Sequence, residues 1–81
     1  NDEIYSFRAQ IHFAKNDLKN ALKDIDRAIQ HRSDNIEHWK LKGYIEETKG
    51  ELKNASDSYM KALMIDDSDS IALNRLYDLL Y

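Results

Sequence analysis

The residues that could carry chemistry are three histidines, His12, His31 and His38, and several clustered carboxylates. Two histidines on one helix hold zinc when they are four positions apart, and no two of these are. Cysteine is absent, so no thiolate can complete a metal site or act as a nucleophile. The sequence therefore predicts no metal site, and we expect His31 and His38 to lie at the surface.

The densest run of carboxylates is Asp66, Asp67 and Asp69. It lacks the glycine and the closing glutamate of an EF-hand loop, so a helix cap in a solvated turn is the simpler interpretation. No nucleophile elbow, phosphate-binding loop or dinucleotide fingerprint occurs elsewhere. We predict that the chain is not an enzyme and binds no cofactor.

Composition favours one small helical domain. The 81 residues are 42% hydrophobic and contain no proline and only two glycines, which suits helices better than a turn-rich all-β fold. The net charge of −3 comes from interspersed signs and gives no reason to expect nucleic acid as a partner. No apolar run is long enough for membrane insertion. The chain begins without Met, and we expect it to be part of a longer protein, with the cytoplasm as the first compartment to consider.

Apolar spacing of three and four predicts five helices. They cover about 3–15, 18–31, 36–49, 52–65 and 70–81. The breaks between them hold helix-capping residue types, at 16–17, 33–35, 50 and 66–69. Links this short between helices predict antiparallel hairpins.

One apolar stripe is predicted on the first helix. It consists of Ile4, Phe7, Ile11 and Ala14, and Tyr5, Ala9 and Phe13 widen it. Residues at this spacing share one helical face.

An internal repeat organises the chain. The tetrapeptide 18–21, Leu-Lys-Asn-Ala, returns unchanged at 52–55, and the same 34-residue offset pairs Ile11 with Ile45 and Ala28 with Ala62. A fixed period of this length is typical of helical repeat proteins. Gly43 interrupts a helix at a cost of roughly 1 kcal/mol relative to alanine, which predicts that a neighbouring helix leaves no room there for a side chain.

These residues resemble the tetratricopeptide (TPR) repeat, a 34-residue helix–turn–helix unit. The second unit carries the family's spacing at Trp39, Gly43, Gly50, Ala55, Tyr59 and Ala62. The first carries it at Tyr5, Ala9, Ala21, Ile25 and Ala28, with Asn16 in place of the glycine. The resemblance implies an all-α, right-handed solenoid in one domain, with repeats 2–35 and 36–69 and a terminal helix 70–81.

The chain departs from the family pattern at two kinds of place. The usual proline near the end of the second helix is replaced by Ser33 and Asp67, and the usual tyrosine of the first helix by His12 and Glu46. By its place in the repeat, His12 is expected to pack between helices.

The resemblance implies a protein–protein interaction module whose first helices line a concave groove for a peptide or a partner helix. The predicted groove residues are Ser6, Gln10, Phe13, Lys40, Tyr44, Glu47, Asn74 and Arg75. The same face also carries Glu3, Ala14, Glu37, Thr48, Ile71 and Asp78. Phe13 and Tyr44 either anchor a ligand or pack between repeats, and the sequence leaves both readings open.

One TPR subclass binds the C-terminal carboxylate of chaperones with Lys, Asn, Asn, Lys and Arg. The corresponding positions here are Ser6, Gln10, Leu41, Ile71 and Arg75. Only Arg75 fits, and one arginine does not offset the desolvation of a carboxylate. We therefore predict that the chain is not a clamp of this kind.

The terminal helix is apolar on more than one face, although an open solenoid end is normally polar. The alternative function is therefore a structural or oligomerisation unit that forms a homodimer. Its predicted self-association residues are Leu76, Leu79, Leu80 and Tyr81.

Overall fold

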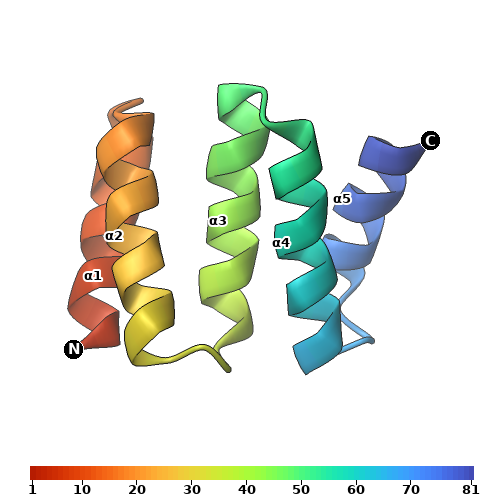
Figure 1. Ribbon diagram of the computed structural model, residues 1–81, viewed down its shortest axis with the longest axis horizontal. Coiled ribbons are helices and arrows are strands. Elements are labelled where there is room, and N and C mark those ends of the chain that lie inside the picture. Colours follow the sequence, from red (N-terminus) through yellow and green to blue (C-terminus); the bar gives the residue numbers. More distant parts are fainter.

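The computed structural model describes all 81 residues and contains five helices and no strands. The helices are α1 (Asp2–Ala14), α2 (Leu18–His31), α3 (Ile36–Lys49), α4 (Leu52–Ile65) and α5 (Ser70–Leu80). Figure 1 shows them side by side in chain order, with α1 behind α2. The predicted all-α solenoid of hairpins is confirmed. None of the helices is both long and apolar enough to cross a bilayer.

Local capping chemistry sets the ends of the helices. Backbone N–H groups in the first turns of α2, α3 and α5 donate hydrogen bonds to the side chains of Asp17, Asn35 and Asp69, respectively. Left-handed backbone at Asn16 (φ 62°) and Gly50 (φ 84°) follows α1 and α3, and these two residue types tolerate that conformation best. The breaks predicted from the sequence are therefore the observed ones.

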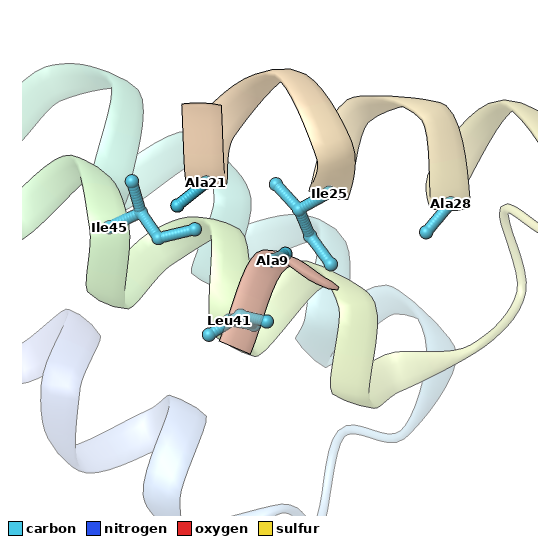
Figure 2. Close-up of a cluster of buried hydrophobic side chains, with 6 residues drawn as sticks. All are labelled: Ala9, Ala21, Ile25, Ala28, Leu41 and Ile45. Atoms are coloured by element: carbon cyan, nitrogen blue, oxygen red, sulfur yellow. The ribbon is translucent and has the colours of Figure 1, made fainter. Parts of the chain in front are cut away.

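The first hydrophobic core joins the first hairpin to α3. Figure 2 shows Ala21, Ile25 and Ala28 of α2 directed toward Leu41 and Ile45 of α3, with Ala9 of α1 between them. The three alanines and Ile25 are completely buried. Because alanine is small, the helix backbones can approach closely, and the two larger residues of α3 fill the remaining space.

The second core lies between α3, α4 and α5 and surrounds Tyr59, which is completely buried. A Cβ atom built on Gly43 would lie 2.5 Å from the Tyr59 ring. This distance is well inside van der Waals contact, so the predicted close approach at Gly43 is confirmed.

The apolar stripe of α1 is divided between buried and exposed residues: Ala9 is buried and Tyr5 and Phe13 are half-buried. Ile4, Phe7 and Ile11 are 58%, 64% and 42% exposed, and Ala14 is also exposed. Their equivalents 34 residues later include Leu41 and Ile45, which are buried because α2 packs against them. No helix covers the same face of α1, which instead buries Ala9 against α2.

Candidate functional site

Three adjoining hollows follow the first helices of the hairpins. The hollow at the α1 end, about 400 Å³, is lined by Glu3, Ser6, Phe7, Gln10, Asn35, Glu37 and His38. A middle hollow of about 310 Å³ is lined by Ser6, Gln10, Glu37, Leu41 and Tyr44. The hollow at the α5 end, about 200 Å³, is lined by Phe13, Tyr44, Glu47, Thr48 and Arg75. Because neighbouring hollows share residues, we treat them as one groove along α1, α3 and α5.

The aromatic residues at the α5 end serve two purposes. Phe13 and Tyr44 are half-buried and pack against the first core, while both also line the groove. The guanidinium of Arg75 lies over the Tyr44 ring, 5.3 Å from the ring centroid. Arg75 Nη1 also lies 3.5 Å from Glu47 Oε2. This end of the groove therefore combines two ring surfaces with a compensated ion pair.

Lys40 does not belong to the groove surface, which corrects the prediction. Its side chain is 8% exposed, and Nζ donates to Asp69 Oδ2 at 3.0 Å and lies 3.2 Å from Glu37 Oε2. Burial opposes the charge on Lys40, but the hydrogen bonds to Asp69 and Glu37 outweigh it and raise the pKa of the ammonium. Lys40 therefore attaches α3 to the start of α5.

The remaining predicted groove residues divide clearly. Asn74 is exposed but lines none of the three hollows. The other six predicted residues line the hollows, and so do Glu3, Glu37 and Thr48 from the same face. The prediction missed four residues that also line the hollows, Phe7, Asn35, His38 and Leu41. Leu41 is only 9% exposed and also belongs to the first core.

His38 is buried rather than at the surface, which corrects a second prediction. Its side chain is 3% exposed, and Nε2 lies 2.8 Å from Asp2 Oδ2. This hydrogen bond lowers the pKa of Asp2. The repeat places His38 where α1 has Ile4, on the face of α3 that the first hairpin covers. His31 does lie at the surface, where it stacks on Tyr5 with ring centroids 5.4 Å apart.

His12 and Glu46 occupy equivalent places in the two hairpins, and both lie between helices. His12 is half-buried and faces Asp17 and Asp24. Glu46 is 4% exposed and accepts a hydrogen bond from the Ser58 hydroxyl. Burial raises the pKa of Glu46 despite that bond. In the described structure, no three side chains of metal-binding type converge on one point.

The predicted self-association residues of α5 differ in burial. Leu76 and Leu79 are half-buried and pack against the second core. Leu80 and Tyr81 are 58% and 89% exposed. The exposed apolar surface at α5 also includes Ile71, Leu73 and Tyr77, so three of its five large members lie outside the predicted set.

Comparisons with known proteins agree with this architecture. A family model described as tetratricopeptide repeat matches residues 2–35 and 39–69. Similar solved structures include the first TPR of Spaghetti (RPAP3) bound to the HSP90 peptide SRMEEVD, with a TM-score of 0.94 and 19% identity over 99% of this chain. The Arabidopsis OM64 TPR domain gives a TM-score of 0.93 and 20% identity, also over 99%. This chain spans 64% and 66% of those two chains. No curated protein sequence matches it.

Proposed function

The chain belongs to the tetratricopeptide repeat family, whose members are protein–protein interaction modules, and we propose that it binds a peptide or helix in the groove of α1, α3 and α5. The observation that supports this is the row of adjoining hollows, which ends at the ring surfaces of Phe13 and Tyr44. Repeats 2–35 and 36–69 with the terminal helix would form one such module within a longer protein.

The groove presents more negative than positive charge to a ligand. Arg75, the only lysine or arginine that lines the hollows, is already compensated by Glu47. Glu3 at the α1 end forms no ion pair. This balance favours a ligand with an apolar side chain at Phe13 and Tyr44 and no strong negative charge.

The test is selection of ligands from a random peptide display library with the whole chain as bait. We expect selected peptides to shift the amide NMR signals of α1 and α3 and to lose at least about tenfold in affinity with Gln10→Arg, which fills the middle of the groove. Lys61→Ala on exposed α4 is the matched control and should leave affinity unchanged. Peptides whose shifts fall on α2 and α4 instead would contradict the proposal.

The HSP90 peptide SRMEEVD, which is bound in the Spaghetti complex, serves as a ligand that we expect this chain not to bind tightly. Of the residues at the clamp positions here, Leu41 is almost completely buried and Ile71 is apolar. Only Arg75 is cationic, and its guanidinium already faces Glu47. In fluorescence anisotropy we expect labelled SRMEEVD to bind this chain at least about a hundredfold more weakly than the Spaghetti TPR domain, since charge-assisted hydrogen bonds are missing.

Self-association is a second candidate, favoured by the exposed apolar residues of α5. Tyr77, Leu80 and Tyr81 are 63%, 58% and 89% exposed. If this surface pairs with a second copy, sedimentation should show a dimer that Leu80→Asp converts to monomer. A monomer at high concentration would count against self-association and would leave the proposal of peptide binding in the groove unchanged.

A further inference from the structure

A separate polar cavity of about 320 Å³ lies between α1 and α2. It has no hydrophobic lining and is formed by Arg8, His12, Asn20, Lys23, Asp24 and Arg27. On a helix with 3.6 residues per turn, Arg8 and His12 lie on the other side of α1 from Ser6 and Gln10. The cavity shares no residue with the groove and plays no part in the function proposed above.

Asp24 is the most buried residue of this cavity, with a side chain 4% exposed. Its carboxylate lies 3.5 Å from Arg8 Nε, 3.5 Å from His12 Nε2 and 3.7 Å from Arg27 Nη1. These distances exceed those of ordinary hydrogen bonds, and Oδ2 has no hydrogen-bond partner. A buried acceptor without a donor is costly. Asp24 is therefore compensated in charge but still lacks a donor.

The cavity also holds more positive charge than Asp24 needs. Arg8 and Arg27 are 52% and 53% exposed, so most of their N–H donors remain accessible. Lys23 is exposed and forms no ion pair. The Tyr5 ring lies 6.0 Å from the Arg8 guanidinium and 5.9 Å from that of Arg27, which restricts both side chains at the rim. Three cations surround one carboxylate in a protein whose net charge is −3.

We propose that this cavity binds a phosphate group that retains a proton, as inorganic hydrogen phosphate or a phosphate monoester does. Such a group has oxygens that accept from Arg8, Lys23 and Arg27 and a hydroxyl that donates to the Asp24 carboxylate. At a pH of about 6, which is the second pKa of a phosphate monoester, about half of such groups retain this proton. Sulfate has no such proton, so its oxygens would only repel the Asp24 carboxylate. The cavity therefore distinguishes phosphate from sulfate, which a simple cationic surface does not.

The experiment is an amide NMR titration of the whole chain with sodium phosphate and, in parallel, with sodium sulfate, at constant ionic strength and a pH of about 6. We expect saturable shifts around Arg8, Asn20 and Lys23, with phosphate at least about tenfold tighter than sulfate. Equal affinities for the two anions, or shifts that do not saturate, would overturn the proposal. A phosphoserine peptide tested alongside distinguishes the source: tighter binding than inorganic phosphate indicates a phosphorylated protein segment, and equal binding indicates the free ion.

Three variants complete the test. Lys23→Gln should weaken phosphate binding about tenfold, whereas Arg32→Gln, whose partner Asp34 lies outside the cavity, should leave it unchanged. Asp24→Asn gains a donor and should abolish the preference for phosphate over sulfate. Because Asp24 is buried, its variant is first checked by circular dichroism. If Asp24→Asn does not fold, the test rests on Lys23→Gln, whose exposed side chain can be changed without disturbing the core. Undiminished phosphate affinity in Lys23→Gln would refute the site.

Discussion

At the scale of single residues, Gly43 shows how a local cost indicates a tertiary contact. Glycine is a poor helix former, and the sequence alone predicts that something must compensate for it. The structure identifies the Tyr59 ring as the neighbour that excludes a side chain. By contrast, no local signal indicates that His38 and Lys40 are buried, because His38 binds Asp2, 36 residues away, and Lys40 binds Asp69, 29 residues away, in addition to nearby Glu37.

Gly43→Ala tests this contact. Alanine gains roughly 1 kcal/mol of helix propensity, but its Cβ would meet the Tyr59 ring at 2.5 Å, and overpacking of a core costs about 1–3 kcal/mol. We expect net destabilisation in urea denaturation. Lys61→Ala on the exposed side of α4 should change stability by less than about 0.5 kcal/mol. A more stable Gly43→Ala variant would mean that Tyr59 can move aside.

Glu46→Gln tests the buried carboxyl group. Because the pKa of Glu46 is raised by burial, the folded state holds its proton to higher pH than the unfolded chain. The protonated group therefore makes its full contribution to folding stability when the pH is below the ordinary glutamate pKa of 4.5. That contribution is lost as the pH rises through the pKa of the folded state. Glutamine keeps an acceptor for Ser58 without the charge. At pH 7 we expect the variant to melt a few degrees higher, corresponding to about 1 kcal/mol or less.

The matching pH dependence separates this explanation from a general packing effect. The difference in Tm between Glu46→Gln and the parent should shrink as the pH falls and vanish below about 4.5. A difference that is constant across this range would point to a cause other than ionisation.

At the scale of helices, the two equivalent stripes of α1 and α3 have opposite environments. Phe7 of α1 is 64% exposed, whereas Leu41 of α3, its counterpart in the repeat, is 9% exposed. Spacing along a helix tells which residues share a face, but it does not tell which helix covers that face. The difference comes from α2, which precedes α3 in the chain and packs against it.

Paired substitutions measure this difference. Leu41→Ala should cost about 2–4 kcal/mol in the free energy of unfolding, because it leaves a cavity against Ile25 and Ala28. Phe7→Ala at the equivalent exposed place should change it by less than about 1 kcal/mol. Comparable losses in the two variants would show that the exposed stripe is covered in solution.

The helix boundaries of this chain could be predicted from its sequence, but the residues of the groove only in part. The helix ends were predictable because caps such as Asp17, Asn35 and Gly50 act within one turn of their own position. Six of the eight predicted groove residues line the hollows, because a fixed repeat carries one helical face to the next. The position of Lys40 could not be predicted in this way, because the carboxylate that accepts its hydrogen bond belongs to Asp69, at the start of another helix.

At the scale of the whole molecule, packing is sequential. The main helix contacts are α1 with α2, α2 with α3, α3 with α4 and α4 with α5. The two buried cores share only the half-buried Tyr44 among the side chains that pack against them. In such a chain stability is approximately a sum of units and of the joints between them.

Ile25→Ala should therefore act locally. It removes one of the two isoleucines that are completely buried in the first core, at a cost of about 2–4 kcal/mol. In native-state hydrogen exchange we expect the amides of α1 and α2 to lose protection, while those of α4 around Tyr59 lose much less. Equal loss throughout the chain would show that the two cores unfold as one unit.

The attachment of Lys40 to Asp69 has a chemical consequence for the lysines of this protein. Nucleophilic attack by a lysine requires an accessible, unprotonated amine, and Lys40 is buried with a raised pKa. Amine-reactive reagents and acetyl donors should therefore modify exposed Lys19 and Lys61 well before Lys40. Reaction at Lys40, followed residue by residue in a mass spectrometer, would then report the moments when α5 detaches from α3.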